Sequence, residues 1–154
     1  MPKSEVFKVR TPLSLDKAKQ IIEAARSRAR ERRFMPMTAV VLDIGGNTIA
    51  LEREDGCGLM REALARGKAG GALGFGIASR TIGERSQGRD AFMAAAAVAA
   101  DGQFIPVPGG VVVLDQGEVI GAVGISGDVS DADEECAIAG IEAAGFKAGI
   151  DTPD

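Results

Sequence analysis

The chain has 154 residues, of which 45% are hydrophobic and 26% charged, and its formal net charge is −4 at pH 7. The length fits one globular domain with a single core, and the negative charge argues against a general nucleic-acid-binding surface. Histidine and tyrosine are absent, which excludes Ser-His-Asp and Cys-His catalysis, the usual histidine-bearing zinc sites and a histidine ligand to haem iron.

The sequence shows no segment that would direct the chain to a membrane or out of the cell. Residues 1–15 lack an apolar run of signal-peptide length, and charged residues or glycines interrupt the longer apolar runs. Cys57 and Cys136 form no CxxC motif, so reduced thiols are the simplest interpretation. We therefore expect a cytoplasmic protein without a membrane partner. The 21 glycines let backbones approach closely, which favours a homo-oligomer.

The first third of the chain predicts an amphipathic helix followed by a hairpin. Ser14 is a suitable N-cap, and apolar residues then recur at helical spacing until the helix ends near Arg33. Two β-prone runs, 38–43 and 48–53, flank the glycine-rich turn 44–47, as in a β-hairpin. A cluster of arginines in the helix either binds phosphate or forms its solvated basic end, where cations suit the helix dipole. The cluster comprises Arg26, Arg28, Arg30, Arg32 and Arg33.

The middle of the chain is helical but rich in small residues. Leucines, alanines and glycines recur at helical spacing over residues 59–73. The glycines weaken this helix unless they are contact points for another element. Residues 79–90 are polar and predict a mobile loop or a short irregular helix, whereas residues 92–100 predict an alanine-rich helix.

The last third predicts a second hairpin and a final helix. Residues 111–114 and 119–125 are continuous apolar runs, which are typical of central strands covered on both faces. Ser130 is expected to cap the last helix, with Asp133 three residues later as in a capping box. That helix should end near Gly145, before a frayed tail.

The order of these elements predicts an α+β fold. Two hairpins separated by helices imply an antiparallel sheet with helices packed against it, rather than the parallel sheet of βαβ units. No linker or internal repeat is visible, so we expect one domain over residues 1–154 with its core at about 13–146.

Two groups of charged residues are candidates for a functional site. Arg53, Glu54 and Asp55 end the first hairpin, where an arginine facing a cleft can bind a carboxylate with two hydrogen bonds; the alternative is a solvated turn. Lys68 is the lone lysine of the glycine-rich helix. It is either a desolvated base or anion partner, or a surface lysine that keeps its ammonium in water.

A third candidate is the turn Pro108-Gly109-Gly110, whose backbone amides could hold an anion or an oxyanion. A tight turn that enters the next strand is the alternative. Cys57 lies beside the first group and could be an exposed thiol, whereas Cys136 is expected in the core. The sequence predicts no metal site.

Several short motifs, in their order and spacing, resemble the GlcG/HbpS family, also called the haem-degrading domain and found as the C-terminal part of PduO-type proteins. The resemblance covers about Leu13 to Phe146. The matching residues are Leu13-Ser14-Leu15, Val41-Leu42-Asp43, Gly45-Gly46, Asp55-Gly56, Lys68-Ala69, Phe75-Gly76, Pro108-Gly109-Gly110, the run Gly117 to Gly127, and Asp133-Glu134. The resemblance implies about five antiparallel strands with helices on both sides. It also implies homo-oligomers, often octamers, and binding of haem or related tetrapyrroles in some members.

Three functions are open at this point, of which the third is a purely structural oligomer. The first is an oligomeric small-molecule-binding protein of the GlcG/HbpS type that supports a catabolic or cofactor pathway, with haem or another tetrapyrrole as the ligand that the resemblance suggests. Its small organic ligand would bind Arg53, Glu54, Lys68 and the turn Pro108-Gly109-Gly110, within one chain or across a subunit interface. The second is a metal-independent isomerase, lyase or hydrolase for a small carboxylate or carbonyl compound. There Arg53 would hold the anion, and Lys68 or a carboxylate such as Asp55 would move the proton.

Overall fold

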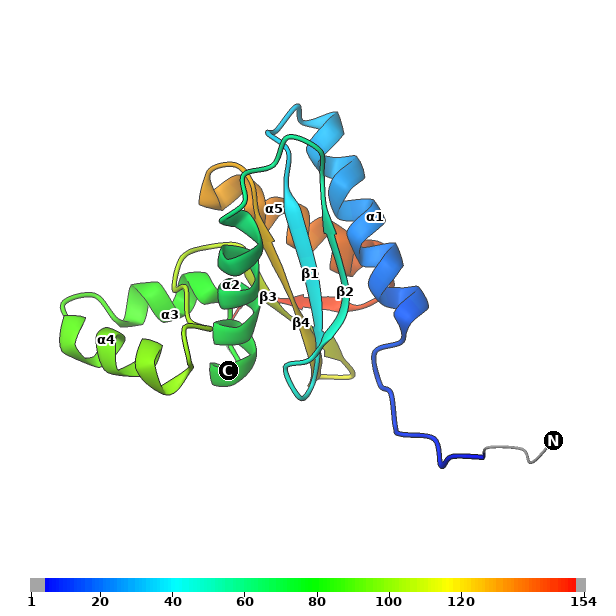
Figure 1. The fold of residues 1–154 in the computed structure, drawn as a ribbon, viewed down its shortest axis with the longest axis horizontal. Helices are drawn as coiled ribbons and strands as arrows, with labels where there is room; N and C mark the ends of the chain where they lie inside the picture. Colours follow the sequence, from blue (N-terminus) through cyan, green and yellow to red (C-terminus); the bar gives the residue numbers. More distant parts are fainter. Residues whose placement is uncertain (1–4, 152–154) are drawn as a thin grey trace.

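The computed structural model describes residues 5–151 of the chain. Within this part the chain forms five helices and five strands, joined by loops (Figure 1). The helices are α1 (Leu15–Glu31), α2 (Arg61–Phe75), α3 (Ser79–Arg85), α4 (Asp90–Ala99) and α5 (Ser130–Ala143). The strands are β1 (Thr38–Asp43), β2 (Thr48–Arg53), β3 (Gly110–Asp115), β4 (Glu118–Ser126) and β5 (Lys147–Gly149). Both predicted hairpins and the predicted helices are present, and residues 79–85 form the short helix of the two alternatives.

The strands form one antiparallel sheet in the order β2-β1-β4-β3-β5. Both hairpins are joined through the pairing of β1 with β4, so β4 lies at the centre and is buried over most of its length. The prediction of a frayed tail after Gly145 is wrong, because residues 147–149 pair with β3 as an edge strand. Three residues are too few to show the alternation of hydrophobic and polar residues that indicates a strand. Only their pairing with β3 in the structure identifies them as a strand.

Helices cover both faces of the sheet, which confirms the α+β sandwich. Figure 1 shows α2 on the left of the sheet and α1 on the right, where α1 packs on α5, and α3 and α4 lie farther to the left. The larger core lies between the sheet and the pair α1 and α5, and includes Ile21, Val123 and Ile141. A smaller core lies under α2 and includes Val40 and Leu42.

The helix starts show one correct and one wrong prediction. Ser14 caps α1 as expected, since its Oγ accepts a hydrogen bond from the Lys17 backbone N at 3.2 Å. Ser130 does not cap α5: Val129 occupies the N-cap position, and its backbone N donates a hydrogen bond to Asp128 Oδ1 at 2.7 Å. The buried carboxylate of Asp133 accepts one hydrogen bond from the Asp128 backbone N, just before α5, and its other oxygen faces Lys68.

Glycines bring α2 unusually close to the sheet and to the segment that follows α4. A Cβ atom at Gly124 of β4 would overlap the carbonyl oxygen of Ala65, and one at Gly67 would overlap the side chain of Ile105. The prediction that the glycines of this helix are contact points is therefore confirmed at Gly67. The close approach places the Lys68 side chain between layers of the fold.

Of the helices within residues 5–151, none combines the length and the apolar character needed to cross a bilayer.

Candidate functional site

A polar hollow of about 480 Å³ lies where β2 ends beside the C-terminal half of α1. It contains the three charged residues predicted at this hairpin end, Arg53, Glu54 and Asp55. From α1 come Arg26 and Arg30, which are one turn apart and therefore lie on the same helix face. The remaining lining residues are Pro36 and Glu52. We call this site the arginine hollow.

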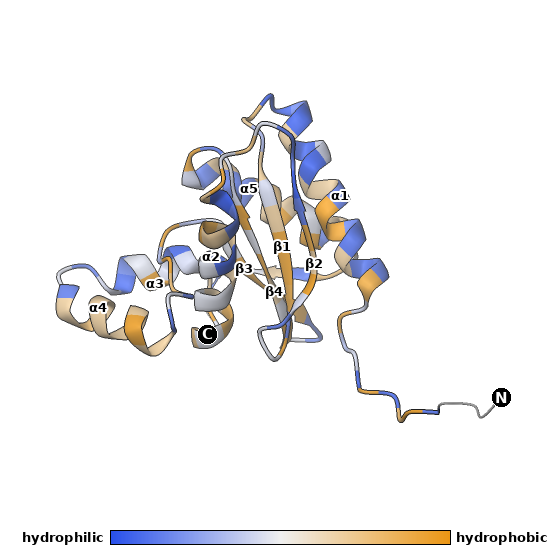
Figure 2. Cartoon of the chain, in the orientation of Figure 1, coloured by the Kyte–Doolittle hydropathy of each residue, from blue (hydrophilic) through white to orange (hydrophobic). Residues whose placement is uncertain are grey.

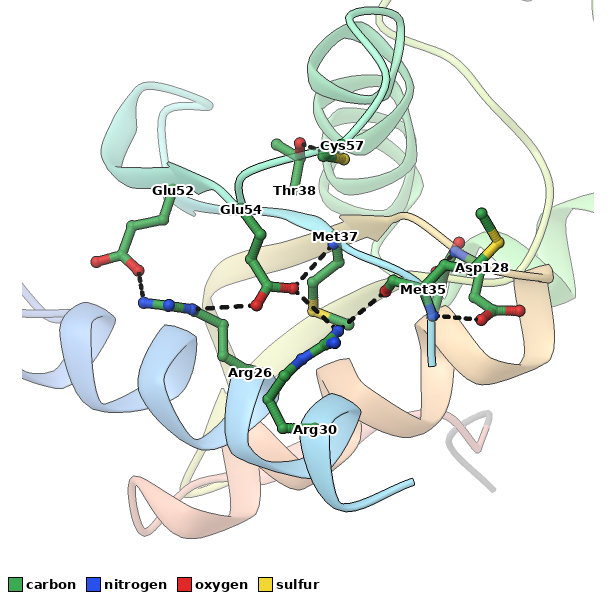
Figure 3. Close-up of polar contacts among 10 residues, drawn as sticks. Arg26, Arg30, Met35, Met37, Thr38, Glu52, Glu54, Cys57 and Asp128 are labelled. Carbon is green, nitrogen blue, oxygen red and sulfur yellow. Dashed lines mark hydrogen bonds and ion pairs between the residues drawn. The ribbon is translucent and has the colours of Figure 1, made fainter. Parts of the chain in front are cut away.

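Glu54 connects α1 to the sheet beneath the arginine hollow (Figure 3). Its carboxylate is only 12% exposed and accepts hydrogen bonds from the Met37 backbone N at 2.9 Å and from Arg30 Nη2 at 3.2 Å. Its second oxygen lies 3.7 Å from Arg26 Nε, while Arg26 Nη1 lies 2.9 Å from Glu52 Oε2. Glu52 and Glu54 thus already neutralise the two arginines that α1 contributes to the arginine hollow, Arg26 and Arg30. Glu54 acts here as a structural link, and its predicted contact with a ligand stays a prediction.

Two of the other arginines near the end of α1 also face carboxylates. Arg28 and Arg32 both lie within 4 Å of Glu135 in α5, at 3.7 Å and 3.1 Å. These pairs are partly exposed, so each contributes little to stability. These ion pairs favour the interpretation of the cluster as a solvated basic helix end. A phosphate-binding site would need arginines that are not already paired with carboxylates.

Arg53 differs from the arginines of α1. It is exposed, lines the arginine hollow, and makes no ion pair within residues 5–151. A guanidinium with its donors free in a hollow can take a carboxylate with two parallel hydrogen bonds. Asp55 lines the same hollow and is also exposed. The arrangement allows the anion-binding role predicted for Arg53.

Lys68 lies elsewhere, buried between α2, β4 and α5. Its side chain is 4% exposed, and its Nζ donates hydrogen bonds to Asp133 Oδ2 at 2.8 Å and to the Ile125 carbonyl at 3.0 Å. The side chain of Asp133 is 1% exposed, and its Oδ1 accepts a hydrogen bond from the Asp128 backbone N at 2.9 Å. Lys68 is therefore desolvated rather than at the surface, but the anion that it binds belongs to the same chain.

The burial of this ion pair controls its acid–base behaviour. Burial raises the pKa of Asp133, and the hydrogen bond and positive charge of Lys68 oppose that rise. Removing one member of a buried pair leaves the other charge uncompensated and is strongly destabilising. The pair is thus a polar connection between α2 and α5, which lie on opposite faces of the sheet.

The turn before β3 lies against Lys68. Gly109 has φ +128°, and a Cβ atom there would lie 2.9 Å from Lys68 Nζ. The amide of Gly110 donates to Ser79 Oγ at 2.8 Å. This amide is therefore already bound within the chain, and an anion-binding role of the turn stays a prediction.

The structure does not bring all the predicted groups into one hollow of a single chain. Lys68 and Gly109 pack against each other near the end of β4, where Lys68 also donates to the Ile125 carbonyl. Arg53 instead lines the arginine hollow at the end of the edge strand β2. In the sheet β1 separates β2 from β4, so the two groups belong to different parts of the fold. The expectation of a shared pocket within one chain is wrong; a pocket that joins them across two chains stays a prediction.

Sequence reasoning missed Asp133 as the partner of Lys68. A signal was present, because Asp133 falls on the buried stripe of α5 that also contains Ala137 and Gly140, at spacings of four and seven residues. A carboxylate on such a stripe needs a buried partner. Within α2, Lys68 was the one ammonium that could supply it.

The two cysteines are in unlike surroundings. Cys136 is fully buried, and burial raises its pKa to about 12, which confirms it as an unreactive core residue. Cys57 is half-buried, and its Sγ lies 3.4 Å from Thr38 Oγ1 (Figure 3). Within residues 5–151, no group of three or more cysteine or acidic side chains is arranged to hold a metal ion.

Comparison with known proteins confirms the fold. The model of a family described as haem degrading protein HbpS-like matches residues 13–142. No curated protein matches the chain. The PduOC:haem complex is similar in structure with a TM-score of 0.80 and 24% identity, over 90% of this chain and 99% of that chain. Protein ORFY of Klebsiella pneumoniae gives 0.80 and 24% over 94% and 98%, and HbpS gives 0.73 and 24% over 92% and 96%. At this identity the three structures show a common fold.

Proposed function

The chain belongs to the HbpS-like family of haem-degrading proteins, and from this premise we propose that it binds a small organic molecule that carries a carboxylate. The observation that supports this best is the arginine hollow. There the guanidinium of Arg53 makes no ion pair within residues 5–151, while Arg26 and Arg30 are held by Glu52 and Glu54. The ligand carboxylate would take the donors of Arg53. A supporting role in a cytoplasmic catabolic or cofactor pathway is part of this proposal and rests on the resemblance.

A tetrapyrrole is a candidate for this ligand, because one structural relative is a complex with haem and natural tetrapyrroles carry carboxylates. The arginine hollow fits the carboxylates but not the iron. Haem iron is held in proteins by histidine, cysteine, methionine or tyrosine, and the residues that line the hollow include none of these. The proposal therefore depends on the carboxylates alone.

The first prediction concerns Arg53. Replacing Arg53 by glutamine should weaken binding of a carboxylate ligand by about tenfold or more, because a hydrogen bond to a charged group contributes about 1.5–3 kcal/mol. Protoporphyrin without metal and haemin should bind equally well, since the hollow offers no ligand to iron. Fluorescence quenching or the absorption near the Soret band measures both affinities, and a thermal-shift screen of small organic acids tests smaller ligands.

A matched control is Arg85→Gln, which removes an exposed arginine of α3 far from the hollow. It should leave binding unchanged. Haemin that binds at least tenfold more tightly than the metal-free ring would contradict binding by carboxylates alone. Equal binding by the Arg53 variant and the control would rule out the arginine hollow as the site.

Binding without turnover is better supported than the alternative of an enzyme. The proposed proton carrier Lys68 is 4% exposed and already donates to Asp133, so a substrate cannot reach its ammonium in the single chain. Catalytic roles for Lys68, Arg53 and Asp55 stay predictions.

Helix α4 supports the proposal that the protein is a homo-oligomer. Its ten residues are almost all apolar, none of them is buried, and Val98 is 82% exposed. Isolated helices of fewer than about 12–15 residues are marginal in water. One contact of α4 with the rest of the chain is the edge-to-face pair of Phe92 and Phe75, at 6.4 Å between ring centroids. A second copy would supply the missing cover.

The second prediction follows from this exposed helix. Val98→Asp should shift the protein to a smaller species in native mass spectrometry, because the charge would be buried against a second copy. In a monomer the same change would cost almost nothing, since the side chain is already in water. The control Val129→Asp, at an exposed position before α5, should preserve the assembly. An unmodified protein that is monomeric, or a Val98 variant with the original mass, would contradict the proposal; the resemblance suggests an octamer.

A further inference from the structure

Residues 5–12 extend away from the body as an arm (Figure 1). Val6 and Val9 are each 87% exposed and Phe7 is fully exposed, so three large apolar side chains lie in water within four positions. Figure 2 shows hydrophobic and hydrophilic residues in turn along the arm. The arm precedes residue 13, where the match to the family model begins. It therefore lies outside the residues that the family model matches.

The root of the arm is fixed to the body and determines where the arm can reach. Arg10, Thr11 and Pro12 line a hollow of about 420 Å³ together with the turn between β3 and β4. In the sheet, β1 and β4 lie between that end of β3 and the edge strand β2. The arm leaves from this root in a direction away from its own sheet (Figure 1).

Strand β2 offers the edge that such an arm fits. It pairs only with β1, so in the described chain its outer edge carries no strand over six residues. An open edge presents backbone N–H and C=O groups that pair readily with an added extended segment. The opposite edge, β5, is only three residues long and gives far fewer such groups.

The side chains of the arm and of β2 match on both faces of the sheet. In an extended segment Phe7 and Val9 point to one face, and Lys8 and Arg10 to the other. On β2, Leu51 packs on the α2 side with the smaller core. Glu52 faces α1, where it pairs with Arg26 and keeps a half-exposed carboxylate. In a register that places Phe7 beside Leu51, Lys8 lies on the same face of the sheet as Glu52.

We propose that the arm of one copy pairs with β2 of a second copy as a sixth strand. This contact rests on the proposed assembly, and it adds a second connection to the one through α4. It gives the exposed Phe7 and Val9 an apolar surface to cover, and it closes the long open edge of the sheet.

Cysteine cross-linking between two separately made variants tests this contact. Both would carry Cys57→Ser; one adds Lys8→Cys and the other adds Glu52→Cys. After mixing, subunit exchange and mild oxidation, we expect a disulfide-linked dimer of the two different chains, with at least a fivefold lower yield when Phe7→Asp is also present. The control partner carries Lys147→Cys, on the β5 edge, and should give no such dimer.

The outcomes separate this proposal from the proposed assembly. An oligomer by native mass spectrometry that gives no cross-link, or that links Lys8→Cys equally well to Lys147→Cys, overturns the arm contact alone. A monomeric protein overturns both. A cross-link to Glu52→Cys that persists unchanged with Phe7→Asp overturns the part assigned to the apolar side chain.

Discussion

Replacing Lys68 by methionine should lower the free energy of unfolding by about 3–5 kcal/mol, the range for breaking one side of a buried ion pair. The change leaves the carboxylate of Asp133 without the ammonium that now lies 2.8 Å away, and with only the Asp128 amide as a close partner. Urea unfolding at fixed protein concentration measures the loss.

The loss in this variant should depend on pH in a defined direction. Burial already raises the pKa of Asp133, and Lys68 opposes that rise, so removing Lys68 raises the pKa further. A carboxyl group whose pKa is higher in the folded than in the unfolded state binds its proton more tightly when folded. The variant should therefore be least destabilised at acidic pH and should lose stability as the pH rises through the folded pKa.

A second replacement provides the control for this experiment. The double variant Lys68→Met with Asp133→Leu removes both charges, and it should recover most of the lost stability because apolar residues often replace a buried pair at little cost. A single Lys68→Met variant that loses less than about 1 kcal/mol would contradict the structural role of this pair. So would a double variant that is less stable than the single one.

Two glycine-to-alanine changes should alter stability in opposite directions. Gly124→Ala places a methyl group where the carbonyl oxygen of Ala65 lies, so α2 must move away from the sheet. Overpacking of this kind costs about 1–3 kcal/mol and occasionally more, and contact with backbone places it at the upper end. Gly74→Ala meets no atom of the described chain within 4 Å and lies within α2, so it should stabilise by about 0.5–1 kcal/mol.

Chemical unfolding of the two variants beside the unmodified protein provides the measurement. Both variants replace glycine by alanine. The difference between their free energies of unfolding therefore reports mainly how much room each site leaves for the added methyl group. Equal effects, or a Gly124 variant as stable as the original, would show that α2 is not held as close to the sheet as the structure describes.

Local chemistry made much of the fold readable from the sequence. Ser14 marks the start of α1 because a hydroxyl at that position can bind a free backbone amide, and it does so in the structure. Both hairpins were visible from β-prone runs that flank glycine-rich turns, and their antiparallel pairing follows from their short connections. The edge strand β5 was missed, because three residues carry no period and only the neighbour β3 makes them a strand.

The sequence also indicated which residues carry the chemistry, but not how they group. It selected Arg53 because a charged residue at a strand end can face a cleft, and Lys68 because it is the lone lysine of a glycine-rich helix. It could not show that Lys68 meets Asp133 across the sheet, since these residues are 65 positions apart and their contact exists only after α2 and α5 pack on opposite faces. Burial and pairing depend on the neighbours in space, whereas caps, turns and hydrophobic periods depend on neighbours along the chain. The sequence by itself therefore determined the elements other than β5, their order and the family resemblance. Only the tertiary structure decided that Lys68 is held inside while Arg53 lines an open hollow.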